Sequence, residues 1–101
     1  MSMPLNVIPG AVGVSALAES GISEAIAASS AAGAVSLTGT TPMAQDADSV
    51  AFAVALNAAG SAYLAAAAEH VGQRVTFAGA QDLAAGTYPA VDAINAGNLG
   101  V

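Results

Sequence analysis

Two heptad stripes run along residues 49–85, and they constrain the fold more than any other feature of the chain. In each stripe the residues recur at alternating steps of four and three, which is the spacing of one helix face. The first stripe consists of Phe52, Leu56, Ala59, Tyr63, Ala66, His70, Gln73 and Phe77. The second consists of Val50, Val54, Asn57, Ser61, Leu64, Ala68, Val71, Val75 and Ala78. They begin two residues apart, about 200° around a helix, so this helix needs neighbours on opposite sides.

Breakers and capping residues divide the chain into five segments. Residues 1–9 contain Pro4 and Pro9 and are expected to be extended, and a first helix is predicted over residues 10–35. A linker follows over residues 36–48, where Asp46 or Asp48 offers an N-cap. The second helix is predicted over residues 49–85. Gly86 is expected to cap it, and the tail over residues 87–101 is expected to be flexible.

The predicted fold is an all-α antiparallel helical hairpin over residues 10–86 that completes a four-helix bundle with a partner chain. The first helix is shorter and covers only one side of the second, which leaves an apolar strip that soluble monomers avoid. Either stripe can face the first helix, and self-association can also supply the missing half. The expected packing residues are Val12, Leu17, Ile22, Ile26, Phe52, Leu56, Tyr63, Leu64, Val71, Val75 and Phe77.

Composition excludes several classes of function. The chain is 55% hydrophobic with only 8% charged residues, and its net charge is −6 with Arg74 as the one basic residue. One cation cannot neutralise a phosphate backbone, so nucleic-acid binding is excluded. Without cysteine there is no disulfide, catalytic thiolate or zinc thiolate site. The single His70 and the scattered carboxylates form no catalytic or metal-binding pattern, so no enzyme activity, metal or cofactor is expected.

The alternative function is that of a small membrane-inserting or membrane-spanning helical protein. Residues Val50 to Ala68 form 19 positions without a charge, long enough to cross a bilayer. Asn57, Gly60 and Ser61 interrupt this run, and no lysine or arginine flanks it before Arg74. These interruptions favour a soluble helix over a transmembrane one.

A short motif, Tyr88-Pro89-Ala90-Val91-Asp92, follows the predicted second helix. Together with an N-terminal Val-Ile-Pro segment and an Ala-rich hairpin of about this length, this Tyr-x-x-x-Asp pattern resembles the mycobacterial PE family. Pro9-Gly10 stands where the family has Pro-Glu. Within the family, the chain is most similar to the short members encoded beside ESX loci, the iron-regulated one among them.

The resemblance implies a function that the residues alone do not. PE proteins pair with PPE proteins, each supplying one hairpin to a four-helix bundle. The folded pair leaves the cytoplasm through a type VII (ESX) secretion system without a cleaved signal peptide and is secreted or stays with the cell envelope. By resemblance, Tyr88 and Asp92 belong to the export signal, beside a WxG turn of the partner. An EspG-type chaperone is expected to bind through the PPE subunit.

Overall fold

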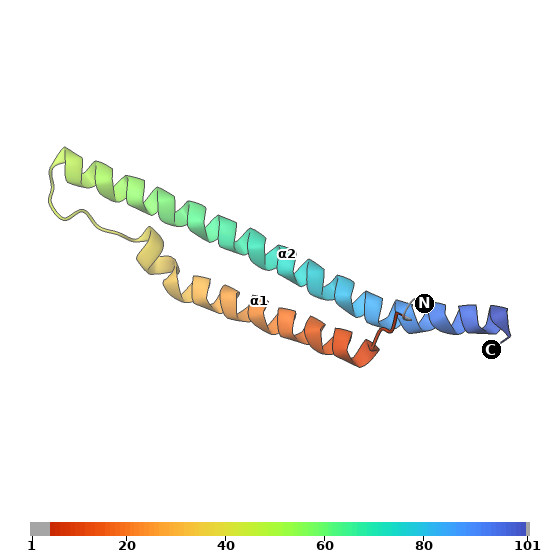
Figure 1. Cartoon of the computed structure of the whole chain (residues 1–101). Helices are drawn as coiled ribbons and strands as arrows, with labels where there is room; N and C mark the ends of the chain where they lie inside the picture. The colour runs from red at the N-terminus through yellow and green to blue at the C-terminus, as the bar shows by residue number, and fades with distance from the viewer. Residues whose placement is uncertain (1–4, 101) are drawn as a thin grey trace. The chain divides into compact units, whose positions relative to one another are not determined.

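The chain folds into two long helices joined by a short linker (Figure 1). The computed structural model describes residues 5–100, with α1 over Pro9–Thr38 and α2 over Ala47–Leu99. Within this range residues 5–8 and 39–46 are not helical. The predicted all-α helical hairpin is therefore confirmed. The first four residues of the segment predicted to be extended, and the last residue of the predicted tail, lie outside the described residues.

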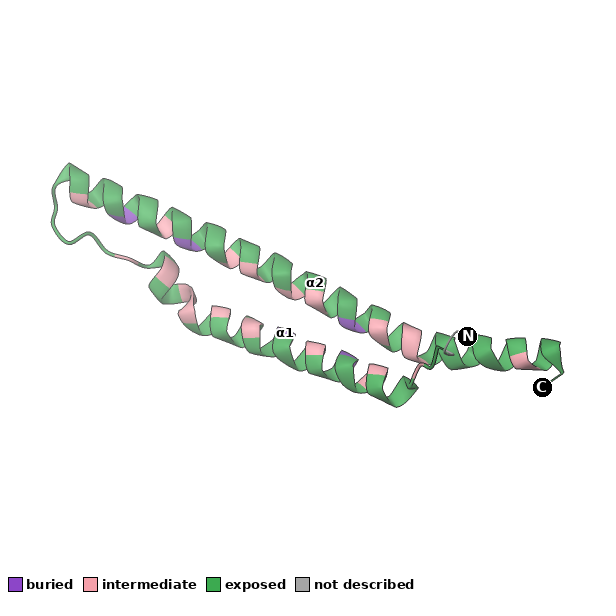
Figure 2. Cartoon of the chain, viewed as in Figure 1, coloured by how far each residue is buried: buried purple, intermediate pink, exposed green. Residues whose placement is uncertain are grey.

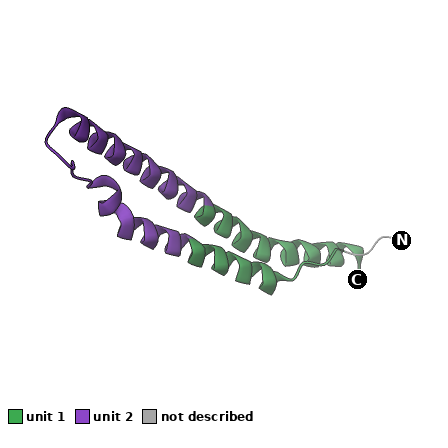
Figure 3. Cartoon of the chain, turned by 60° about the vertical axis from the view of Figure 1, so that its left-hand side comes forward, with its two compact units in different colours: residues 1–22, 74–101 green, residues 23–73 purple. Residues whose placement is uncertain are grey.

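The hairpin divides into two compact units, coloured separately in Figure 3. The loop unit comprises residues 23–73, which are the second half of α1, the linker and the first half of α2. The terminal unit comprises residues 1–22 and 74–101, which bring the first half of α1 together with the second half of α2. Each unit is thus a pair of helical segments that are far apart in the sequence.

Backbone hydrogen bonds define both ends of α1. The carbonyl of Ile8 accepts hydrogen bonds from the N–H groups of Ala11 (3.0 Å) and Val12 (3.2 Å), and Pro9 occupies the first helical position, where no N–H is needed. At the other end, the N–H of Gly39 donates to the carbonyl of Val35 at 2.8 Å. The helix is four residues longer than the predicted range of 10–35, because it begins one residue earlier at Pro9 and continues three residues further to Thr38.

Asp46 caps the beginning of α2. Its carboxylate accepts hydrogen bonds from the backbone N–H and the hydroxyl of Ser49, both at 2.9 Å. The N–H of Ser49 is one of the donors that a helix start leaves without an internal partner, so the cap satisfies it. The backbone hydrogen bond, and then the hydroxyl one, hold the pKa of Asp46 below its usual value. Of the two N-caps offered by the sequence, the structure selects Asp46.

The predicted end of α2 at Ala85 was wrong. The helix continues through Gly86 and Pro89 to Leu99, so residues 87–99 are not a flexible tail. Pro89 cannot donate a hydrogen bond to the carbonyl of Ala85 and its ring crowds that carbonyl, yet the helix continues beyond it. Gly86 keeps a negative φ, whereas Gly100 has a φ of 71° and its N–H bonds to the Gly97 carbonyl at 3.2 Å. The glycine that ends the helix is therefore Gly100.

Small residues form the contact between the helices within each unit. Buried and intermediate residues follow one side of each helix (Figure 2), and the buried apolar ones are Ala16, Ala53 and Ala78. On α2 this side is a third heptad stripe, one position after the Phe52 stripe: Ala53, Asn57, Gly60, Leu64, Ala67, Val71, Arg74, Ala78 and Gln81. This side shares Asn57, Leu64, Val71 and Ala78 with the second predicted stripe, and its other members belong to neither predicted stripe. Small side chains permit a close approach that phenylalanine and tyrosine would prevent.

Candidate partner interface and export motif

Several large side chains of α2, the aromatic ones among them, lie on a side that is exposed in the described part of the chain. We call this side the Phe52 stripe, with the eight members given above from Phe52 to Phe77. Phe52 is 67% exposed, Tyr63 is 61% exposed and Phe77 is 54% exposed. No member of the stripe is an aspartate, glutamate, lysine or arginine. An exposed apolar side without charge is typical of a surface that becomes buried on association.

Two hollows in the loop unit show which residues of the two helices share a side. One hollow, of about 400 Å³, brings Ser36 of α1 together with Leu56, Ala59 and Tyr63 of α2. Another, of about 240 Å³, brings Ala27 of α1 together with Ala68 of α2. The Phe52 stripe therefore shares its side with Ser36 of α1, whereas Ala27 lies beside Ala68 of the second predicted stripe. The opposite side of α2 contains Val54, Ala68 and Val75, and we call it the Val54 side. Ala27 of α1 lies beside Ala68 on this side, and Glu24 lies one turn before Ala27 on the same face of α1.

The predicted packing residues fall into two groups. The structure half-buries four of them in the contact between the helices: Val12, Ile26, Leu64 and Val71. The other seven are exposed: Leu17, Ile22, Phe52, Leu56, Tyr63, Val75 and Phe77. Val75 is 55% exposed on the Val54 side of α2, together with Asp82 one heptad later. The side chains of the second group are between 44% and 73% exposed.

The loop unit is held together at its linker end by contacts to the backbone. The side-chain amide of Asn57 donates to the carbonyl of Thr40 (3.0 Å), and its oxygen accepts from the N–H of Thr40 (2.8 Å). One turn later, a methyl group on Gly60 would overlap the carbonyl oxygen of Leu37. Only glycine permits this approach. Sequence reasoning placed Asn57 in an apolar stripe and did not identify this role, since no local pattern indicates it.

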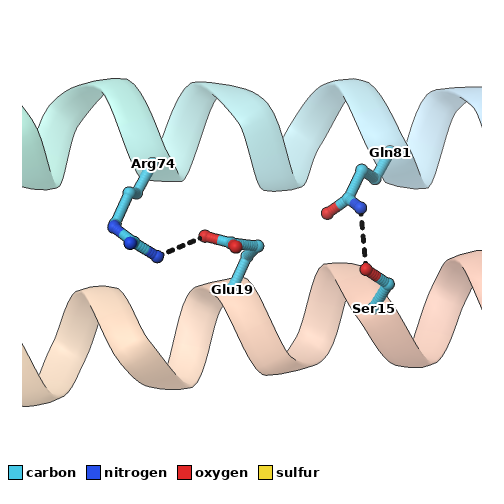
Figure 4. Close-up of polar contacts among 4 residues, drawn as sticks. All are labelled: Ser15, Glu19, Arg74 and Gln81. Carbon is cyan, nitrogen blue, oxygen red and sulfur yellow. Dashed lines mark hydrogen bonds and ion pairs between the residues drawn. The ribbon is translucent and has the colours of Figure 1, made fainter.

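Two polar pairs join the helices in the terminal unit (Figure 4). The guanidinium of Arg74 donates to the carboxylate of Glu19 at 2.9 Å, and the amide of Gln81 donates to the hydroxyl of Ser15 at 2.8 Å. The side chains of Arg74 and Glu19 are only 31% and 22% exposed. Sequence reasoning assigned no role to Arg74, the single basic residue. In an antiparallel hairpin that turns at the linker, Arg74 lies close to Glu19.

Tyr88 and Asp92 lie within α2 and not after it. They are four residues apart on one helix, so both belong to the same face. Tyr88 is 49% exposed and borders a hollow of about 460 Å³, which Leu83, Ala84 and Val91 also line. The motif therefore presents an aromatic ring and a carboxylate from a rigid helix, which differs from the flexible tail that was predicted.

Other kinds of site find little support in the described part of the chain. Residues 5–100 contain no group of three or more His, Cys, Asp or Glu side chains that could hold a metal ion. Both helices are long and apolar enough to cross a membrane by length and composition alone. The geometry thus defines a helical-hairpin protein with an uncovered apolar side.

Comparison with protein families identifies the class. Residues 5–95 match the PE family, so the chain belongs to that family. It is a family of non-enzymatic helical proteins that in general pair with PPE proteins and are secreted by type VII systems. Searches of curated proteins and of solved structures found no match.

Proposed function

We propose that this chain is a non-enzymatic subunit that pairs with a PPE-family protein and is exported as a folded pair by a type VII (ESX) secretion system. The observation that carries the proposal is the exposed Phe52 stripe on a hairpin of the PE family. In this proposal the stripe receives the partner's hairpin and completes a four-helix bundle. The Val54 side, with Glu24 and Asp82, stays in water.

The surface area of the chain supports a missing partner. The accessible surface is 7287 Å². A folded monomer of this mass exposes about 5,000 Å². The surplus exceeds the ~800 Å² that each partner buries in an interface of standard size. Association with a second hairpin would therefore remove apolar area that the chain cannot bury alone, at about 25 cal/mol per Å² before association costs.

The experiment is co-expression with a PPE-family protein, followed by size-exclusion chromatography of the tagged pair. Phe52→Glu tests the interface because a charge buried without a partner is costly. Val54→Glu is a matched control, since Val54 is 64% exposed against 67% for Phe52 and lies two residues away on the same helix. We expect Phe52→Glu to abolish co-purification and Val54→Glu to leave it unchanged. Equal retention of both variants would contradict the proposal.

The proposal assigns Tyr88 and Asp92 to export. Because both side chains lie on one helix, their spacing is fixed. The secretion machinery or the adjacent part of the partner can therefore bind both together. We expect Tyr88→Ala and Asp92→Asn to leave the purified pair intact and to remove it from the culture filtrate. Loss of the pair itself in either variant would assign that side chain to assembly instead. The EspG-type chaperone is proposed to bind the PPE subunit, so neither substitution should affect its capture.

The apolar length of both helices favours one other candidate, a membrane-inserting protein. This function predicts that the chain partitions into detergent or liposomes in the absence of any protein partner. The pairing proposal predicts instead that the chain alone self-associates or is poorly ordered, and that the partner makes it soluble. Flotation of the chain with liposomes, with and without the PPE protein, separates the two functions.

A further inference from the structure

The linker between the helices (Figure 1) forms one wall of a hollow at the beginning of α2. The hollow has a volume of about 530 Å³, and Phe52 and Leu56 of the Phe52 stripe line it from α2. Pro42 and Met43 line it from the linker. The apolar surface of the stripe therefore continues past the end of the helix onto the linker.

The linker is held in place at both ends. The reciprocal hydrogen bonds between Asn57 and Thr40 fix its beginning, and the cap that Asp46 forms with Ser49 fixes its end. Between them, the ring of Pro42 restricts the backbone further. The hollow is thus formed in the chain without a partner. A surface that needs little ordering loses less conformational entropy when it associates.

Met43 is the linker side chain best suited to a binding surface. It is 100% exposed, and Phe52 on the other wall of the hollow is 67% exposed. A methionine side chain is unbranched and polarisable, so it adapts to the shape of the group that it contacts. Methionine and phenylalanine are also enriched in the buried centre of protein interfaces.

The lining of the hollow determines the kind of group that fits it. Asp48 contributes one carboxylate, which would repel an acidic side chain. A small side chain would leave most of the volume unfilled and would lose the packing contacts. The hollow therefore fits a large, uncharged apolar side chain. The apolar residues that line it are Pro42, Met43, Phe52, Ala53 and Leu56.

We propose that the linker is part of the interface with the PPE partner, and that the hollow between Met43 and Phe52 receives one large apolar side chain of the partner's hairpin. The inference rests on the proposed function, in which that hairpin lies along the Phe52 stripe. Because Phe52 and Leu56 belong to both the stripe and the hollow, a helix that follows the stripe reaches the hollow. The interface thereby extends beyond the heptad positions of α2.

The test compares one carboxylate introduced at two neighbouring positions of the linker. Met43→Glu places a charge in the hollow, whereas Ala44→Glu places it at an exposed residue that does not line the hollow. Neither position is helical, so both variants are expected to fold. The dissociation constant of the purified pair with the co-expressed PPE-family protein is expected to rise about tenfold for Met43→Glu. For Ala44→Glu it is expected to stay within about twofold of the wild type.

A second measurement does not depend on affinity. Hydrogen peroxide oxidises an exposed methionine to its sulfoxide, and mass spectrometry of the peptides locates the added oxygen. Ala44→Met introduces a reference methionine next to Met43. In the purified pair of this variant, Met43 is expected to be oxidised about fivefold more slowly than the reference, because the partner covers the hollow.

Three outcomes would overturn the inference. The first is an equal dissociation constant for Met43→Glu and Ala44→Glu, and the second is an equal oxidation rate for the two methionines. The third is a wild-type complex with two copies of the chain that Met43→Glu reduces to one, which would assign the hollow to a second copy. A wild-type chain that forms no pair with a PPE-family protein would instead overturn the proposed function, so the two failures are distinguishable.

Discussion

The two units of the hairpin hold their helices together by different means. In the loop unit the contacts are made to the backbone, through Asn57 with Thr40 and through the close approach of Gly60 to Leu37. In the terminal unit they are made between side chains, through Arg74 with Glu19 and Gln81 with Ser15. A contact to the backbone is possible in only one register of the two helices, whereas long side chains can pair in several registers. The comparison teaches that contacts to the backbone determine the register in the loop unit, whereas pairs of polar side chains determine it in the terminal unit.

The largest expected effect is that of Gly60→Ala. Its methyl group would overlap the Leu37 carbonyl oxygen, so the helices of the loop unit must separate, at a cost of about 3 kcal/mol. Gly72→Ala is the matched control, because a methyl group there meets nothing within 4 Å. It should stabilise the helix by up to ~1 kcal/mol. Urea unfolding of the co-purified pair, followed by circular dichroism, measures both, and a Gly60→Ala pair as stable as the Gly72→Ala pair would refute the steric account.

Removal of the Asn57 side chain should have the next largest effect. Asn57→Ala leaves the N–H and carbonyl of Thr40 without their reciprocal hydrogen bonds, which is expected to destabilise the loop unit by about 1–2 kcal/mol. Both partners are uncharged, so the loss should be the same at low and high salt. Urea titrations at 0.05 M and 0.5 M sodium chloride test this, and a loss that shrinks at high salt would place the contact among the electrostatic ones.

Neutralising Glu19 should cost less and should depend on salt. Glu19→Gln removes the charge that faces Arg74, and a partly exposed ion pair contributes about 1 kcal/mol or less. Salt screens this attraction, so the difference from the wild type should narrow at 0.5 M sodium chloride. A double-mutant cycle with Arg74→Gln isolates the interaction between the two side chains. A coupling free energy of zero at low salt would show that the ion pair does not stabilise the terminal unit.

The smallest expected effect concerns the cap of α2 and pH. Because the hydrogen bonds from Ser49 lower the pKa of Asp46 below 3.8, the ionised cap stabilises the folded state fully above that value. The contribution is lost as the pH falls through the lowered pKa. Asp46→Asn should therefore be less stable than the wild type at pH 6, with a difference that narrows toward pH 3. Thermal melts across this range provide the measurement, and a difference that widens with acidification would contradict the cap.

The sequence predicted the parts of the fold that depend on local chemistry. Asp46 was one of two residues offered as the N-cap, and both helices lie close to their predicted beginnings because prolines and capping residues act within one turn. The same local reasoning failed at Gly86 and Pro89, where the helix continues. A glycine and a proline each reduce helix propensity, but neither of them ends α2.

The candidate interface was predicted in outline. The heptad spacing identified the Phe52 stripe and the need for neighbours on two sides, but it did not reveal that the side between the two predicted stripes would face α1. Hydrophobic periodicity ranks faces by apolar character, whereas the closest helix contact is made where side chains are smallest. Alanine and glycine contribute little to such a ranking, so Ala53 and Gly60 did not stand out.

The sequence by itself determined that this chain is helical, that it turns once near residues 39–46, and that its apolar residues exceed what one hairpin can bury. These properties follow from spacing and composition, which act over a few turns. Only the tertiary structure decided which stripe faces inward, that Asn57 binds the backbone of Thr40, and that Arg74 pairs with Glu19. Those contacts join residues 17 and 55 positions apart, so they exist only once the packed helices have a register.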